Sequence, residues 1–387
     1  MTMVYAFLMT QRLTRLLLTL SCGALTSSCA DATGPNATDR VVWHVAGRGL
    51  GAPALGGSTV YFPTADHAVV ALDAGTGALR WRATTGESGQ ETTVGAGENV
   101  VVAGDNVIMP DVRIHAFDAA TGATRWVYQP TVGYGAGFFN LITDGTTVFA
   151  GSPSGYAFAV DAATGVQRWA TQVATDALST TVMDPVVDQG VVFVTMRRFT
   201  NPTSGGVVAI DAVTGAIRWR REFTAVGPNS GSAAVFRCAL WQNLVIAAAD
   251  DGRVYGLDRT TGAIVWTSPR PSDELTYDDQ RPLLMVGGTL IVGSDLLRLT
   301  GLDPATGIER WRLTNNRSID EPMAGDGSHL YAVNTDLELE AVDASNGTLA
   351  WVVKPAGQVG YGFAPYPAVG ATTVYVNSLA GYWAMRK

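Results

Sequence analysis

One phrase recurs seven times along this chain: an aspartate, a glycine four residues later, and a tryptophan four residues after the glycine. The aspartates are Asp73, Asp118, Asp161, Asp211, Asp258, Asp303 and Asp343, and the tryptophans are Trp81, Trp126, Trp169, Trp219, Trp266, Trp311 and Trp351. An eighth tryptophan, Trp43, stands one period upstream. The eight tryptophans lie 38 to 50 residues apart, and self-similarity at such a period is the signature of a repeat fold.

Each copy of the phrase predicts a β-hairpin. An alternating apolar run precedes the aspartate, as in 156–160, and a second short run after the glycine ends in the tryptophan. Two short runs joined by an Asp/Thr/Gly connection are typical of hairpins. The aspartate suits the turn because its carboxylate can accept a hydrogen bond from a backbone N–H farther along. A tryptophan brings about 150–250 Å² of mostly apolar surface, so we expect the tryptophans to pack each repeat against the next.

Two more short apolar runs stand upstream of each hairpin, for example at 233–236 and 244–248. Each period therefore predicts four short strands, and no helical period is present after residue 40. Four antiparallel strands repeated radially make a β-propeller, whereas the alternative, an open solenoid, needs capping repeats at its ends. The chain instead starts with a lone last strand at 40–45 and ends with three strands that lack a fourth. Pairing of 40–45 with this C-terminal blade predicts a closed, all-β propeller of eight blades over 40–387.

The pattern Ala-x-Asp-x-x-Thr-Gly-x-x-x-Trp resembles the pyrroloquinoline-quinone-type propeller repeat, over nearly all of 40–387. That family includes quinoprotein alcohol dehydrogenases and also the BamB-like outer-membrane assembly lipoproteins, which bind no quinone. WD40 and kelch propellers are less similar, because their Gly-His and Trp-Asp signatures are missing. Gly256 and Gly301 replace the usual alanine, and Asn346 replaces the usual threonine. We interpret these departures as local drift.

The first 28 residues predict a secretory signal peptide. Arg12 and Arg15 precede an apolar stretch at 16–25 that is too short to span a membrane, and Met1, Met3 and Met9 are alternative starts. The stretch ends before Cys29 in small residues, which resembles a bacterial lipoprotein signal with Cys29 as the lipidated N-terminus. The alternative is plain secretion with cleavage near Ser28 or Ala30. Residues 29–39 then read as a flexible tether, and the resemblance implies a periplasm-facing protein anchored to the outer membrane.

Net charge and cysteine content limit the classes of partner that we expect this protein to bind. The net charge is −8, and because 1–28 hold two arginines and no acids, the exported form is still more acidic. An acidic chain without a basic patch argues against nucleic-acid binding. Within the propeller Cys238 is the only cysteine, and its apolar context predicts a small core residue. We expect a monomeric propeller whose partners are other envelope proteins.

Catalytic motifs are scarce. None of the four histidines forms a metal-spaced pair with another histidine or cysteine, and no phosphate loop or dinucleotide fingerprint is present. The quinoprotein dehydrogenases of the resembling family carry adjacent cysteines and hold calcium with Glu, Asn and Asp. This chain has no Cys-Cys pair and is much shorter. The acidic pairs at 278–279 and 320–321 could ligate a cation, although solvated loop acids explain them as well. We therefore predict no catalytic, cofactor or metal residues.

Connections between blades carry the candidate binding residues. They are rich in glycine and aromatic side chains at 132–140 and 359–366, and polar at 277–281. In a propeller these connections converge around one mouth of the central channel, and aromatics with polar neighbours suit a partner's loop. The predicted mouth residues are Tyr134, Phe138, Phe139, Asp279, Arg281, Tyr361 and Phe363. The alternative is that these side chains only fill the crowded space near the ring axis.

These patterns support three functional hypotheses. The first is a non-enzymatic, exported scaffold that resembles the BamB-like assembly factors. The second is a quinone-dependent dehydrogenase, and the third is a ligand-binding or sensor propeller. The missing Cys-Cys pair favours the first over the second.

Overall fold

A computed structural model describes residues 40–87, 99–133, 137–174, 180–198, 204–223, 235–249, 251–269, 283–294, 298–314, 323–334, 338–354 and 367–387. All of them belong to one compact unit, Ala37–Lys387. The predicted signal peptide 1–28, Cys29 and the tether 29–39 lie outside the described residues. Within the described residues, no helix has the length and apolar character needed to cross a membrane.

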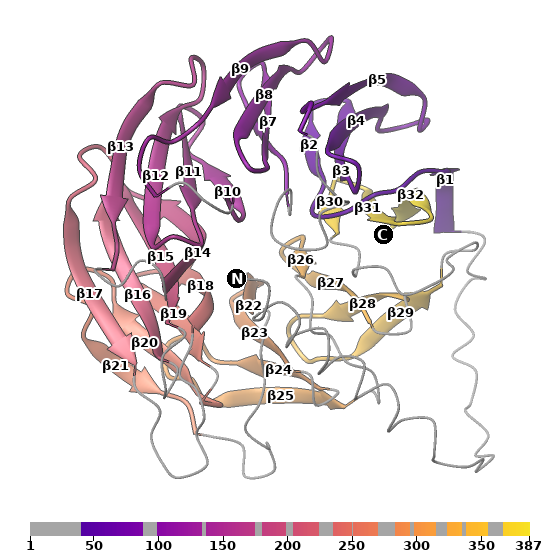
Figure 1. The fold of residues 1–387 in the computed structure, drawn as a ribbon. Coiled ribbons are helices and arrows are strands. Elements are labelled where there is room, and N and C mark those ends of the chain that lie inside the picture. The colour runs from indigo at the N-terminus through magenta and orange to yellow at the C-terminus, as the bar shows by residue number, and fades with distance from the viewer. Residues whose placement is uncertain are drawn as a thin grey trace, which may run out of the picture. The chain divides into compact units, whose positions relative to one another are not determined.

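Eight four-stranded antiparallel sheets follow one another around a ring (Figure 1). We number these blades from the first complete one along the chain. Blades 1 to 4 consist of β2 (Ala54–Gly56), β3 (Thr59–Thr64), β4 (Ala68–Asp73) and β5 (Leu79–Thr84); β6 (Val101–Ala103), β7 (Asn106–Pro110), β8 (Ile114–Asp118) and β9 (Thr124–Tyr128); β10 (Leu141–Thr143), β11 (Thr147–Gly151), β12 (Tyr156–Asp161) and β13 (Gln167–Gln172); and β14 (Thr180–Asp188), β15 (Val191–Arg198), β16 (Ser204–Asp211) and β17 (Ile217–Phe223).

The remaining blades repeat the plan. Blades 5 to 8 consist of β18 (Val235–Trp241), β19 (Leu244–Ala249), β20 (Val254–Asp258) and β21 (Ile264–Thr267); β22 (Leu283–Val286), β23 (Thr289–Ser294), β24 (Arg298–Leu302) and β25 (Glu309–Thr314); β26 (Ala324–Gly325), β27 (His329–Val333), β28 (Leu339–Asp343) and β29 (Leu349–Val353); and β30 (Ala368–Val369), β31 (Thr373–Ser378), β32 (Gly381–Arg386) and β1 (Val41–Val45). The first strand listed for each blade is its innermost strand. The prediction of eight four-stranded blades is confirmed.

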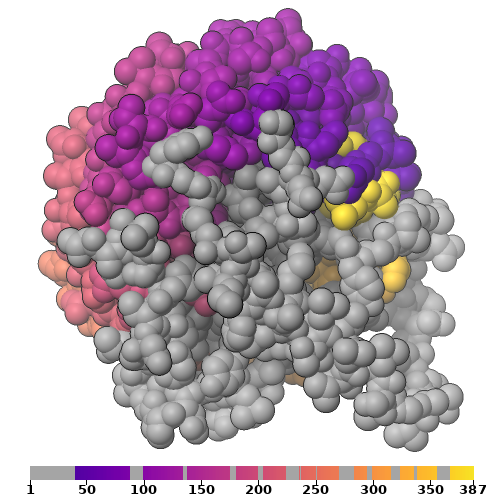
Figure 2. Space-filling view, viewed as in Figure 1, coloured from indigo at the N-terminus to yellow at the C-terminus, as the bar shows by residue number. Residues whose placement is uncertain are grey.

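The N-terminal strand closes the ring, as predicted. β1 pairs antiparallel with β32 and completes the sheet β1-β32-β31-β30. In the space-filling view the indigo first blade lies beside the yellow last strands (Figure 2). The Trp43 indole N–H donates to the carbonyl of Ala74 in blade 1 at 3.0 Å. In blades 1 to 7 the two outer strands are consecutive in the chain, whereas in blade 8 they are β32 and β1. The Arg40 guanidinium, just before β1, lies 4.5 Å from the ring centre of Trp351 in blade 7.

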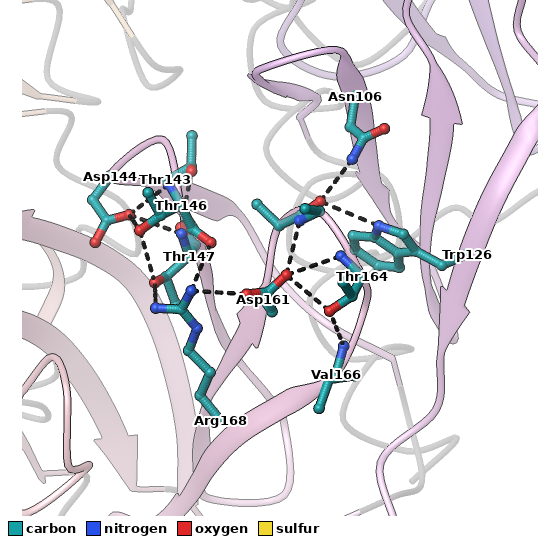
Figure 3. A network of polar contacts seen from close by, with 12 residues as sticks. Asn106, Trp126, Thr143, Asp144, Thr146, Thr147, Asp161, Thr164, Val166 and Arg168 are labelled. Carbon is teal, nitrogen blue, oxygen red and sulfur yellow. Dashed lines mark hydrogen bonds and ion pairs between the residues drawn. The ribbon is translucent and has the colours of Figure 1, made fainter.

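The repeated aspartate organises the turn between the two outer strands of a blade (Figure 3). Asp161 Oδ1 accepts hydrogen bonds from the Thr164 backbone N–H at 2.9 Å and its hydroxyl at 2.8 Å. Asp161 Oδ2 accepts one from Arg168 at 2.8 Å. These contacts, the Arg168 guanidinium foremost, lower the pKa of Asp161 to about 2. The backbone turn recurs at all seven repeat aspartates, because each aspartate carbonyl accepts a hydrogen bond from the glycine N–H four residues later at 2.8–2.9 Å.

The repeated tryptophan joins one blade to the next. The Trp126 indole N–H donates to the Ala162 carbonyl, which is also bonded by Asn106 Nδ2 (Figure 3). Six indole N–H groups make this bond to the residue after the next blade's aspartate, from Trp43, Trp81, Trp126, Trp169, Trp219 and Trp311. The indole N–H of Trp266 is buried without an acceptor. Apolar cores therefore lie between blades, and Trp126, Ile108, Phe158 and Val160 share one of them.

The turn glycine meets the tryptophan of the preceding blade. Gly165 has φ +74°, and a Cβ built there would lie 2.7 Å from Trp126 Cδ2. We expect Gly165→Ala to lower the free energy of unfolding by about 2–4 kcal/mol, because left-handed strain costs about 1–2 kcal/mol and overpacking adds about 1–3 kcal/mol. Urea denaturation measures the loss.

Gly145 supplies the matched control. Its φ is +96°, yet a Cβ there meets nothing within 4 Å, so Gly145→Ala should show the backbone cost alone. Equal losses in the two variants would show that the tryptophan contact contributes nothing.

Candidate functional site

The innermost strands surround a cavity of about 280 Å³. Its lining comes from seven successive blades, so the cavity lies on the ring axis. The lining residues stand on or just before β2, β6, β10, β14, β18, β22 and β26; they are Ala52, Asn99, Asn140, Asp184, Pro185, Val186, Arg237, Cys238, Leu283, Leu284 and Met323. One side of the lining is polar and the other is aliphatic. This channel is the candidate site.

The polar side begins with contacts between blades 1, 2 and 3. Ala52 and Asn99 form a parallel β-bridge. The Asn99 side chain then takes the place of a peptide group: Oδ1 accepts from the Leu141 N–H and Nδ2 donates to the Leu141 carbonyl, each at 2.8 Å. Asn99 therefore extends backbone-like pairing from one inner strand to the next.

An amide, a carboxylate and a guanidinium continue the polar side through blades 3, 4 and 5. Asn140 Nδ2 donates to Asp184 Oδ1 at 2.6 Å, and Arg237 Nε lies 3.2 Å from Asp184 Oδ2. Asp184 is at a bulge of β14 with φ +37°. We call Asn99, Asn140, Asp184 and Arg237 the channel belt. It connects four adjacent blades through side chains.

Cys238 stands beside the belt. Its thiol is buried and free, which confirms the predicted core role. Burial, helped by the charge of Asp184, raises the pKa of the Cys238 thiol to about 12. The thiol therefore stays protonated at neutral pH, and thiolate chemistry is not supported here.

Asp184 is the central residue of the belt. We expect Asp184→Ala to lower the free energy of unfolding by about 1–3 kcal/mol, because the partly buried Arg237 loses its ion pair with Asp184 and Asn140 loses an acceptor. Asp184→Asn should lose less, because asparagine tolerates positive φ and keeps an acceptor oxygen. Urea midpoints measure both, and equal losses would contradict a role for the carboxylate.

Of the seven predicted mouth residues, the structure describes Phe138 and Phe139. Phe138 is only 1% exposed, and its ring packs edge-on against Phe158 with 5.4 Å between centres. Phe139 is half-buried and its N–H donates to the Gly151 carbonyl at 3.1 Å. Phe138 thus belongs to the core between blades 2 and 3, and the next residues bring Asn140 into the channel. Tyr134, Asp279, Arg281, Tyr361 and Phe363 lie outside the described residues.

Sequence reasoning missed the channel belt. The sequence signal that could have found the belt is the number of residues between each belt position and the turn that follows the innermost strand. Ala52, Asn99 and Asn140 each stand five residues before the turn glycine, at Gly57, Gly104 and Gly145. The bulge at Asp184 adds one residue in blade 4. Aligning the blades on these turns would have placed the belt residues in one ring.

A second polar cluster joins blades 1 and 2, and sequence reasoning missed it too. Asp111 is fully buried. Its Oδ2 accepts from Thr85 Oγ1 at 3.1 Å and lies 2.8 Å from His67 Nδ1, and its Oδ1 accepts from the Val112 N–H at 2.7 Å. We call Asp111 and these partners the blade 1–2 junction.

Glu87 extends the junction. Its Oε1 accepts from Arg113 Nε at 2.6 Å and lies 3.0 Å from His115 Nε2. The Arg113 hydrogen bond lowers the pKa of Glu87, and burial lowers the pKa of His115. In the described part of the chain, no three His, Cys, Asp or Glu side chains are placed to share a metal ion. The junction contacts connect blade 1 to blade 2 through hydrogen bonds and ion pairs.

Together these features define an eight-bladed β-propeller of pyrroloquinoline-quinone-type repeats, closed by its N-terminal strand. The chain belongs to the family described as outer membrane protein assembly factor BamB, whose model matches residues 31–198, 176–318 and 284–385.

Solved structures support the fold. BamB from Moraxella catarrhalis is 22% identical with a TM-score of 0.57, over 76% of this chain and 83% of that one. Quinohemoprotein alcohol dehydrogenase from Comamonas testosteroni is 14% identical with a TM-score of 0.65, over 93% and 78%. A europium-containing methanol dehydrogenase is 17% identical with a TM-score of 0.66, over 89% and 85%. These likenesses show the fold alone. No curated protein sequence matches the chain.

Proposed function

We propose that this protein is a non-enzymatic scaffold that holds other proteins of the cell envelope. Its family is described as an outer-membrane assembly factor. The channel belt is the observation that supports the proposal. Both carboxylate oxygens of Asp184 are engaged there, one by Asn140 and the other by Arg237. These groups connect blades and leave the molecule's outer surfaces for partners.

The described residues do not fit the quinone and calcium of the related dehydrogenases. Calcium takes 6–8 oxygen ligands, whereas the belt offers one carboxylate that already faces the cationic Arg237. A quinone that carries several carboxylates needs cations around it, and among the described residues that line the cavity Arg237 is the one cation. No reaction step is therefore assigned to this site.

A thermal-shift experiment tests the enzyme hypothesis directly. Saturating pyrroloquinoline quinone with calcium is expected to leave the unfolding temperature of the full chain unchanged, because a ligand stabilises only when it binds the native state. A shift that depends on both quinone and calcium would overturn the non-enzymatic proposal.

Crosslinking tests the scaffold role and its location. In the native envelope the protein should crosslink to outer-membrane assembly components. The proposed anchor at Cys29 predicts that Cys29→Ser moves the protein from the membrane fraction to the soluble fraction. If the intact protein captures no assembly component, the scaffold proposal fails; if only the Cys29→Ser result fails, the anchor is wrong.

A further inference from the structure

Two blades lack an arginine that the other repeat turns share. In five of the seven repeat turns, an arginine seven residues after the aspartate pairs with it; these pairs are Asp73–Arg80, Asp118–Arg125, Asp161–Arg168, Asp211–Arg218 and Asp303–Arg310. Blade 5 has Val265 at this position and blade 7 has Ala350. The missing arginine leaves a carboxylate without its usual counter-ion in each of these two blades.

The blade 5 carboxylate, Asp258, accepts its hydrogen bonds from neutral groups among the described residues. Asp258 Oδ1 accepts from the Thr261 backbone N–H and hydroxyl, each at 2.8 Å, and Asp258 Oδ2 accepts from the neutral amide of Asn243 at 2.8 Å. No cation pairs with Asp258 among the described residues. Hydrogen bonds from Thr261 lower its pKa, so it is negatively charged at neutral pH. In blade 4 the corresponding oxygen has Arg218 Nη2 at 2.7 Å.

Exposed aliphatic side chains lie next to this charge. Ile264 is 46% exposed and Val265 is 57% exposed. Both lie on β21, the outermost strand of blade 5, and no described strand pairs with its outer edge. Natural sheets protect such edges with charged side chains, and β21 carries none. In blade 7 the exposed Leu349 is followed by a smaller alanine, and Asp343 has His329 nearby.

We propose that Asp258, Ile264 and Val265, here called the blade 5 rim, bind an extended segment of a partner protein that carries one arginine or lysine between aliphatic residues. The partner's cation supplies the charge that an arginine supplies in five other repeat turns, and the partner's aliphatic residues cover Ile264 and Val265. The outer backbone edge of β21, which no described strand covers, can pair with an extended segment. The net charge of −8 favours approach of a basic segment. This inference rests on the proposed scaffold function and names the chemistry of one partner.

Two peptides test the proposal on the full chain. One alternates valine and threonine around a central arginine, and the other has glutamate in place of that arginine. Fluorescence anisotropy should show binding of the arginine peptide and at least tenfold weaker binding of the glutamate peptide. Equal binding of the two, or no binding of either at millimolar concentration, would overturn the proposal.

Variants locate the site. Val265→Arg restores the residue found in five other turns, so it should leave the urea midpoint unchanged or raised while weakening the arginine peptide at least tenfold. Asp258→Asn keeps the turn but removes the charge and should weaken the same peptide. Ala350→Arg places the same charge on blade 7 and should bind like the unmodified protein.

The same variants can also contradict the proposed site. Unchanged binding by Val265→Arg and Asp258→Asn, or equal weakening by Ala350→Arg, would exclude the blade 5 rim. Because the peptides are defined, this result is independent of the envelope crosslinking. If crosslinking to assembly components fails while rim-dependent peptide binding holds, the scaffold's assigned partners are wrong and the rim stands.

Discussion

A chain that begins at Gly47 is expected to lose the cooperative unfolding transition of a chain that begins at Ala37. The deletion removes β1, which supplies the fourth strand of blade 8. It also removes Trp43, which is only 8% exposed. Loss of a buried tryptophan side chain alone costs about 3–5 kcal/mol. The lost strand pairing raises the total above about 5 kcal/mol, which is comparable to the whole stability of many domains.

Urea denaturation followed by tryptophan fluorescence measures this loss. The chain that begins at Ala37 keeps the whole described unit and serves as the control. A synthetic peptide covering 37–47 should restore part of the stability when added to the shortened chain, because it can pair with β32. A shortened chain that unfolds at the same urea concentration as the control would show that closure of the ring is dispensable.

Replacement of Asp111 is expected to have the second-largest effect. Asp111→Ala should lower the free energy of unfolding by about 3–5 kcal/mol, because a buried network loses its shared acceptor. His67, Thr85 and the Val112 N–H would lose their partner together. Equilibrium urea denaturation at neutral pH gives the value.

Asp111→Asn separates charge from hydrogen bonding. It keeps the size and one acceptor oxygen, so its loss should be smaller than that of alanine. The backbone carbonyl of Asp111 also accepts from the Phe138 N–H at 3.1 Å, and both variants retain this bond. An alanine variant within 1 kcal/mol of the unmodified protein would mean that the junction adds little to stability.

The number of blades and the closure of the ring could be predicted from the sequence, because both follow from a repeated pattern. The Asp161 turn is local: its partners Thr164 and Arg168 lie within seven residues, so spacing alone predicts it. The role of the turn glycine was only partly predicted. Positive φ follows from the turn, but the contact between Gly165 and Trp126 joins two blades and is not visible within one repeat.

The candidate sites were less predictable for the same reason. Asp184 meets Asn140 from one neighbouring blade and Arg237 from the other, and these residues are more than forty positions away in the chain. Phe138 was predicted at the channel mouth because aromatic residues beside glycine suit both binding and packing. Its burial against Phe158 shows that packing applies at this position.

Closure by β1 has a consequence for the order in which the protein forms. Of the described strands, β1 is the first to be synthesised, and its partner β32 is the last. Blades 1 to 7 are each built from consecutive strands, so each can pair its strands as soon as it is made. β1 cannot pair until β32 has been synthesised, and until then Trp43 cannot pack in blade 8. Pairing across nearly the whole chain makes this a slow final step, and it leaves the growing ring exposed to wrong partners until synthesis ends.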